Sequence, residues 1–257
     1  MKQQGKYILF DNWKEFKTWL DKQNIKRKIK TIQQHHTWSP NYTNALNHFQ
    51  LCTNMETYHI GSSGMSEIAQ NITTFKDGKV MVCRSLEKDP AGIYRQNSGA
   101  ICIEHVANFD SDIMTDKHKE CILGVTASLC MKFGLDVNKD TIVYHHWFDL
   151  NTGKRTNGTG STKTCPGTNF FGGNKVLNAE VSFYPAVRSY IEKFKNPVKK
   201  EEPEMWKKKI VQEAFDLGLI TDESWIDKAD EGATVWFVLA VVINACAVVI
   251  DAFKKKG

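Results

Sequence analysis

The order of strand-like and helix-like segments in residues 1–195 limits the possible folds of this chain more than any other sequence feature does. Four short runs rich in β-branched and apolar residues predict strands, and two of them flank the turn Lys76-Asp77-Gly78. Three segments with helical spacing of apolar residues predict helices, the first with Asp11 as its N-cap and the second ending at Gly134. The expected strands are residues 72–75, 79–83, 100–106 and 140–146, and the expected helices are residues 11–24, 115–133 and 183–194. Strands alternating with helices predict an α/β fold with a mixed central β-sheet flanked by helices.

Composition changes after residue 195. Residues 196–204 (NPVKKEEPE) are charged and bounded by prolines, which is typical of a linker. Residues 205–257 contain two helical patterns, at 206–217 and 234–253, and predict a small α-helical C-terminal module. We therefore expect a first domain at 1–195, a linker at 196–204 and a module at 205–257.

The second helix of this module contains an uncharged run of 18 residues, Ala233–Ile250. That length is close to the lower limit of roughly 17–25 residues for a membrane span. Thr234, Asn244 and the alanines of the run favour instead a buried helix or a contact between copies of the chain. Membrane association is the alternative to this prediction of a homo-oligomer contact.

Charge is distributed unevenly along the chain. Residues 204–257 hold seven Lys/Arg and nine Asp/Glu, whereas the rest carries an excess of seven positive charges, which predicts a polyanionic partner. The basic stretch at 25–30 (IKRKIK) comes with no nucleic-acid recognition motif, so no nucleic acid is expected. The seven cysteines show no CxxC spacing, and the amino terminus lacks the apolar region of a secretory signal. Both features indicate a chain made in the cytoplasm with reduced thiols.

Metal-binding side chains gather in three places. The pair His35-His36 ends a further predicted strand at 31–36 (TIQQHH), and the pair His145-His146 ends the predicted strand at 140–146. Cys165 lies in the loop after the second pair, among Thr, Lys, Pro and Gly. Imidazole and thiolate are ligands that zinc prefers, and a catalytic zinc takes three protein ligands and leaves one position open. The sequence therefore predicts a site for Zn²⁺ with one histidine from each pair, and strand periodicity does not choose between the members of a pair.

Two charged residues near these groups are candidates for chemistry. Glu104 lies inside the apolar run AICIEHV, where a carboxylate is rarely buried without a task. Strand alternation places it on one face with Cys102 and Val106, and from that face it could accept a proton from a zinc-activated water. Lys163 lies two residues before Cys165, where its charge favours a thiolate or stabilises a developing oxyanion.

The segments IQQHHTWSPNY, GAICIEHVANFD and VYHHWF…TKTCPGTNFFGG resemble the type 2 N-acetylmuramoyl-L-alanine amidases. That family includes phage and clostridial endolysins, and animal peptidoglycan recognition proteins share its fold. The resemblance covers roughly residues 30–195. It implies one zinc held by His35, His145 and Cys165 in a groove at the strand ends, with Glu104 and Lys163 as catalytic residues.

The resemblance also implies a function. The enzyme would cleave the amide between N-acetylmuramic acid and L-alanine of the stem peptide, acting on the cell wall as an endolysin or autolysin after release by a holin or by lysis. Peptidoglycan and its anionic polymers would be the partners. By their position in the sequence alone, Trp38, His59 and Asn71 are expected to line the groove and bind substrate. The C-terminal module would bind the wall or oligomerise. A non-catalytic peptidoglycan-binding protein of the same fold is the alternative.

One spacing departs from the family pattern. Relatives separate the last histidine ligand and the cysteine by about ten residues, whereas here the two are 20 positions apart in the sequence. The additional loop at 149–162 (DLNTGKRTNGTGST) is rich in Gly, Thr and Asn, and we expect it to project over the groove.

Overall fold

The computed structural model describes residues 1–45, 47–195, 205–222 and 224. The chain divides into two compact units, Met1–Asn196 and Pro197–Gly257. In the second unit the helix α6 (Met205–Asp216) lies at the position predicted for the first helix of the module. The linker at 196–204 and the apolar helix at 234–253 lie outside the described residues. Among the described residues, no helix is long and apolar enough to cross a membrane.

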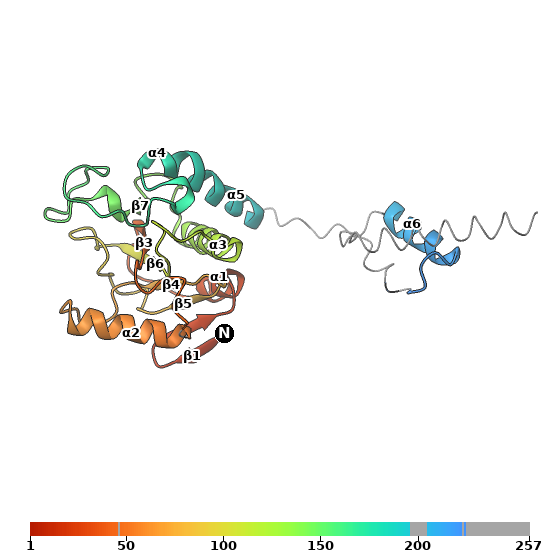
Figure 1. The fold of residues 1–257 in the computed structure, drawn as a ribbon, viewed down its shortest axis with the longest axis horizontal. Helices are drawn as coiled ribbons and strands as arrows, with labels where there is room; N and C mark the ends of the chain where they lie inside the picture. Colours follow the sequence, from red (N-terminus) through yellow and green to blue (C-terminus); the bar gives the residue numbers. More distant parts are fainter. Residues whose placement is uncertain (46, 196–204, 223, 225–257) are drawn as a thin grey trace, which may run out of the picture. The chain divides into compact units, whose positions relative to one another are not determined.

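A single mixed sheet of seven strands forms the centre of the first unit, in the order β1-β2-β5-β4-β6-β3-β7 (Figure 1). The strands β4, β6, β3 and β7 run parallel to one another, and β1, β2, β5 and β4 pair antiparallel. Their bounds are Lys2–Gln4, Tyr7–Phe10, Thr31–His36, Ile72–Thr74, Val80–Val82, Ala100–His105 and Ile142–Tyr144 for β1 to β7. The mixed sheet flanked by helices confirms the predicted fold class.

Helices cover both faces of this sheet, as Figure 1 shows. On one face α1 (Trp13–Asp21), α3 (Asp116–Phe133) and α5 (Tyr184–Lys195) pack over a large core that includes the strand residues Ile32 and Ile101. On the other face α2 (His48–Gly61) packs through Leu51, Cys52 and Met55 onto a smaller core. Between β7 and α5 lie short helical turns at His145–Trp147, Phe170–Gly172, Val176–Asn178 and Ala179–Phe183.

The local signals that end helices act largely as predicted, with one correction. Thr115 caps α3 by accepting the N–H of His118, and Gly134 ends the helix in a left-handed conformation with φ of 64°. The N-cap of α1 is Asn12 rather than Asp11, because the Asn12 side chain accepts the N–H groups of Lys14 and Glu15. The Asp11 carboxylate instead pairs with Lys79 at 3.0 Å.

A chain of buried polar groups joins the sheet to α3. The Tyr42 hydroxyl is 2.7 Å from Nδ1 of His118, and Nε2 of His118 is 2.8 Å from the Thr74 hydroxyl. That hydroxyl is 2.7 Å from Nδ1 of His105, whose Nε2 is 2.9 Å from Oε1 of Gln34. Every group finds a partner when both imidazoles are neutral and each donates from Nε2, because Gln34 Oε1 can only accept. A proton added to either imidazole would turn its Nδ1 into a donor and remove the acceptor to which the facing hydroxyl, of Tyr42 or Thr74, donates.

This arrangement predicts acid sensitivity that a single substitution can measure. Burial lowers the pKa of His118 from 6.5 to about 3, against an opposing effect of the Asp77 carboxylate. Below pH 6.5 the unfolded chain therefore takes up a proton at this position that the folded chain does not, so stability falls as the pH falls. Relative to His118→Gln, the wild type should lose about 1.4 kcal/mol of unfolding free energy for each further pH unit. Urea unfolding of both proteins between pH 7 and pH 5, with chelator present, measures the difference; equal slopes would contradict it.

Candidate metal centre

Strand register brings the first two candidate residues together. β3 and β6 are adjacent and parallel, with His35 opposite Glu104 and Gln33 opposite Cys102. Residues opposite each other on neighbouring strands project from the same face of a sheet, and Nδ1 of His35 lies 3.8 Å from Oε1 of Glu104. Cys102 and Glu104 share this face with His35, as strand alternation predicts.

The strand end after β7 and a distant loop complete the cluster. His145 begins the helical turn that follows β7, and its ring centroid lies 4.8 Å from that of His35. The Cys165 segment is held there by the N–H of His146, which donates to the Cys165 carbonyl at 2.7 Å, and by the N–H of His36, which lies 3.4 Å from Sγ. One ligand atom from each of His35, His145 and Cys165 lies within 4.8 Å of the other two.

The second histidine of each pair has a different task. The backbone N–H of Phe109 donates to Nδ1 of His36 at 3.1 Å, and Nδ1 of His146 lies 2.7 Å from the Lys163 carbonyl. Both side chains therefore brace loops around the cluster. The structure places His35 and His145, rather than His36 and His146, at ligand spacing from Cys165.

The electrostatics of the cluster suit a cation. Burial lowers the pKa of His145 to about 4, with a further effect of Lys163, and burial also places the pKa of His35 well below its usual value. Both imidazoles are therefore neutral near pH 7 and offer lone pairs. Burial raises the pKa of the Cys165 thiol, and a bound cation would reverse that effect. Two neutral imidazoles and one buried cysteine form a donor set that fits zinc.

The Glu104 side chain lies beside this cluster. It is 18% exposed, but its Oε2 is buried and has no hydrogen-bond partner in the described part of the chain. Burial raises the pKa of Glu104 to about 8, while the charge of Lys163 acts in the opposite direction, and a bound cation would also lower this pKa and favour the ionised carboxylate. An unpartnered carboxylate beside a cluster of metal-binding side chains can take up or release a proton.

A cavity of about 970 Å³ opens from the cluster toward α2. It is lined at one end by His35, His145, Cys165, Glu104 and Lys163, and along α2 by Leu51, Asn54, Met55, Tyr58 and His59. Trp38 lines it from the loop after β3, with 63% of its surface exposed and a left-handed φ of 59°. An exposed aromatic ring held in a strained backbone conformation is typical of a ligand-contact position.

Of the three predicted groove residues, the structure brings Trp38 and His59 to the cavity but not Asn71. Asn71 is fully buried, and its Nδ2 donates to the carbonyls of Ser85 and Lys88 at 3.0 and 3.1 Å. Its Oδ1 accepts the N–H of Cys102 at 3.1 Å. The prediction that Asn71 contacts a ligand is corrected: its amide instead bonds to three backbone groups, two in the turn at 85–88 and one in β6.

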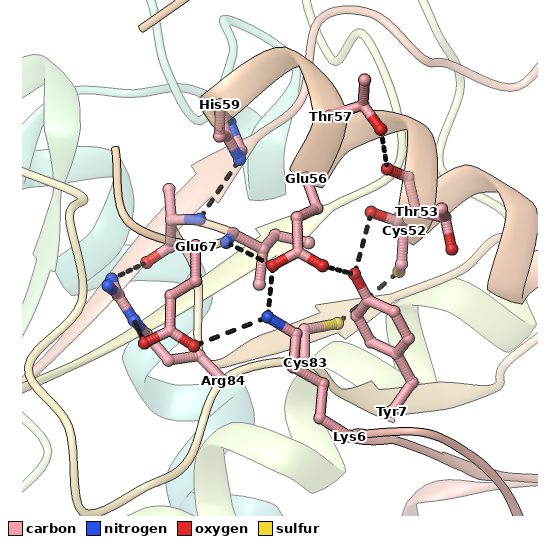
Figure 2. A network of polar contacts seen from close by, with 12 residues as sticks. Lys6, Tyr7, Cys52, Thr53, Glu56, Thr57, His59, Glu67, Cys83 and Arg84 are labelled. Atoms are coloured by element: carbon pink, nitrogen blue, oxygen red, sulfur yellow. Dashed lines mark hydrogen bonds and ion pairs between the residues drawn. The ribbon is translucent and has the colours of Figure 1, made fainter. Parts of the chain in front are cut away.

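A polar network fixes the α2 wall of the cavity (Figure 2). Glu56 on α2 accepts hydrogen bonds from the Tyr7 hydroxyl at 2.5 Å and from the N–H of Ile68 at 3.1 Å, and it pairs with Lys6. On the same side the N–H of Ala69 donates to Nδ1 of His59 at 3.2 Å, which leaves the proton of a neutral ring on Nε2. The hydrogen bond from Ala69 fixes the orientation of His59 in the cavity wall.

The inserted loop takes a different position from the predicted one. None of residues 149–162, all of which the structure describes, lines the cavity. The Asp149 side chain accepts the N–H groups of Asn151, Thr152 and Ser161, which closes the loop on itself. The Gly153 carbonyl accepts a hydrogen bond from Nε2 of Gln96 at 2.8 Å. The loop therefore packs beside the site, against the segment around Gln96, instead of over the groove.

Apart from His59, sequence reasoning missed the α2 wall, including Asn54 and Tyr58. The available signals were Asn47, whose side chain accepts the N–H of Gln50 as an N-cap, and apolar residues at 51, 52 and 55. These apolar positions are interrupted by polar residues such as Thr53 and Asn54, so the amphipathic pattern is weak.

The chain is similar to several solved structures. An endolysin N-acetylmuramoyl-L-alanine amidase, LysCS, from Clostridium intestinale is 19% identical, with a TM-score of 0.42 over 56% of this chain and 78% of that one. Drosophila PGRP-LB is 16% identical, with a TM-score of 0.47 over 64% and 85%. Peptidoglycan recognition protein-LE in complex with tracheal cytotoxin is 17% identical, with a TM-score of 0.45 over 56% and 76%.

The sequence of the chain identifies its family more clearly than these structural similarities do. No curated protein sequence matches the chain. The family model described as N-acetylmuramoyl-L-alanine amidase, by contrast, matches residues 25–168. The matched range is more than half of the 257 residues, and it includes His35, Glu104, His145 and Cys165. The chain belongs to the N-acetylmuramoyl-L-alanine amidase family.

Proposed function

We propose that the chain is a zinc-dependent peptidoglycan hydrolase that cleaves the amide between N-acetylmuramic acid and L-alanine of the stem peptide. One observation carries the proposal: within this family's matched range, His35, His145 and Cys165 converge at ligand spacing at one end of a cavity. Beside them lies Glu104, whose Oε2 has no hydrogen-bond partner among the described residues. Peptidoglycan with its anionic polymers would be the partner, in line with the positive charge of residues 1–203.

The three ligands would hold the ion with one coordination position left open. When bound, zinc supplies Lewis acidity, which polarises an amide carbonyl and activates water near neutral pH. His35 and His145 offer neutral imidazole nitrogens for this purpose, because burial disfavours their protonated forms. Cys165 supplies the one anionic ligand, and its position is fixed by the N–H of His36.

Glu104 would carry the proton through the reaction. Its buried carboxylate accepts the proton of the attacking water and then passes it to the nitrogen of the leaving L-alanine, since an amine leaves more readily than its anion. Lys163 lines the same end of the cavity, and its ammonium group would stabilise the negative charge that develops on the amide oxygen. Trp38 and His59 would bind the sugar or the stem peptide along the cavity.

The residues after the catalytic domain would bring the enzyme to the cell wall or join copies of the chain. We assign the catalytic domain to residues 1–195, a linker to 196–204, and wall binding or oligomerisation to 205–257. The enzyme would act on the cell wall after release from the cytoplasm, as an endolysin or autolysin. A non-catalytic peptidoglycan-binding protein is the competing assignment, and the intact His/His/Cys set argues against it.

Digestion of purified sacculi tests this assignment. The full chain with added zinc should release stem peptides that carry a free amino group on L-alanine, detected by mass spectrometry. The glycan strands should keep their length, because no glycosidic bond is cut. Binding to sacculi without any released peptide would favour the non-catalytic protein, and release of D-alanine alone would indicate a carboxypeptidase.

A further inference from the structure

Two buried polar atoms next to the metal centre have no hydrogen-bond partner in the described part of the chain. They are Oε1 of Gln33 and Nε2 of His35, which belong to the same strand and the same face of the sheet. Both border Gly92: a Cβ on that glycine would lie 3.2 Å from Nε2 of His35 and 3.0 Å from Sγ of Cys102, and would overlap with Oε1 of Gln33. The two unpartnered atoms therefore face one small space beside the Cα of Gly92, called the cradle below, which a single methyl group would fill.

The orientation of the Gln33 amide is fixed from its other end. Its Nε2 donates to the Gln96 carbonyl at 2.8 Å, so the amide oxygen has to point away from Gln96. The Gln96 side chain in turn donates to the Gly153 carbonyl at 2.8 Å, within the inserted loop. Gly153 has φ of 68°, and a Cβ there would overlap with the Tyr94 carbonyl, so the loop approaches this segment as closely as a backbone can.

The two unpartnered atoms are complementary. Gln33 Oε1 is an acceptor only, and Nε2 of His35 is a donor in one of the two neutral tautomers. Leaving a buried polar group without a partner is unfavourable, so a shared hydrogen bond, direct or through one water, is strongly favoured. The other nitrogen, Nδ1, lies on the side of Glu104, 3.8 Å from its Oε1.

We propose that Gln33 is a positioning residue for His35: its Oε1 accepts the proton of Nε2 and thereby leaves Nδ1 as the nitrogen that binds the metal. The inserted loop supports this arrangement through Gln96. The inference rests on the proposed zinc site. Partners of this kind orient an imidazole ligand and increase its basicity, and their loss weakens metal binding about 10–100-fold.

The test compares two neighbouring glutamines in the full chain. Gln33→Leu should raise the zinc dissociation constant about 10–100-fold in competition with a chelator, with one zinc still bound at saturation. Gln34→Leu is the matched control, since Gln34 is equally buried on the same strand but bonds to Thr126 and His105 on the opposite face. It should lower the unfolding free energy yet leave the zinc dissociation constant within about twofold.

Two further measurements keep the inference testable if Gln33→Leu does not fold. Gly92→Ala fills the cradle from the opposite side and should also weaken zinc binding. Nitrogen-15 NMR of the zinc-loaded wild type should show the His35 proton on Nε2. Wild-type affinity in Gln33→Leu or Gly92→Ala, or a proton on Nδ1, would overturn the positioning role while the zinc site stands. A wild-type chain that binds no zinc would overturn the proposed function itself.

Discussion

Glu104→Gln should reduce amide hydrolysis about 10²–10⁴-fold while the protein still binds one zinc. The amide has nearly the same shape as the carboxylate but cannot accept a proton from water. Since Oε2 of Glu104 has no hydrogen-bond partner among the described residues, the substitution breaks no hydrogen bond of that atom. Turnover of a soluble muramyl peptide, with zinc content measured by atomic absorption on the same sample, separates the loss of proton transfer from the loss of metal.

A second glutamate provides a close control for this variant. The Glu56 side chain is 19% exposed, against 18% for Glu104, but it lies in the polar network of the α2 wall. Glu56→Gln weakens contacts with Lys6 and Tyr7 and should lower the unfolding free energy, while turnover changes by less than about threefold. Full activity in Glu104→Gln, or an equal loss in both variants, would remove Glu104 from the reaction.

Cys165→Ala should abolish zinc binding while Glu104, the proposed proton carrier, remains in place. Zinc binding needs all three ligands, and Cys165 supplies the only thiolate of the set. We expect the purified variant to contain less than about a tenth of a zinc per chain and to show no amide hydrolysis above background. Elemental analysis after dialysis measures the metal, and circular dichroism checks that the fold persists.

Cys121→Ala is the control for Cys165→Ala: it is the same substitution at a buried cysteine that lies outside the metal cluster. Cys121 is fully buried between α3 and the sheet, so the same truncation creates a cavity in the large core. It should lower stability by a few kcal/mol at most and keep a full complement of zinc. A Cys165→Ala protein that retained one zinc would show that the cluster of His35, His145 and Cys165 is not the metal site.

Much of the fold could be predicted from local signals. The hairpin around Lys76–Gly78, the middle strand β6 and the capped helix α3 all appear at the predicted positions, because turn chemistry, β-branched runs and caps act within a few residues. The strands β1 and β2 and the helix α2 were not predicted. β1 is exposed and polar, and α2 follows a weak apolar pattern, so the sequence gives little sign that either packs on the sheet.

The sequence predicts which types of residue form the candidate site, but not which neighbours each of these residues contacts. Which histidine of each pair faces Cys165 depends on the register of β3 beside β6 and β7, and that register is a tertiary property. Asn71 and the loop at 149–162 were misplaced for the same reason. The Asn71 amide bonds to three backbone groups, in the turn at 85–88 and in β6, and Asp149 closes the loop on itself. Gln33 gave no signal because only the approach of Gly92 reveals its free oxygen.

The most direct test of the central claim is a zinc titration of the metal-free full chain on purified sacculi. New amino-terminal L-alanine is counted as a function of the zinc added. The proposed function predicts no release without metal, a linear rise up to one zinc per chain and no rise in Cys165→Ala. Release of amino-terminal L-alanine by the metal-free chain, or a zinc-loaded chain that releases none, would contradict it.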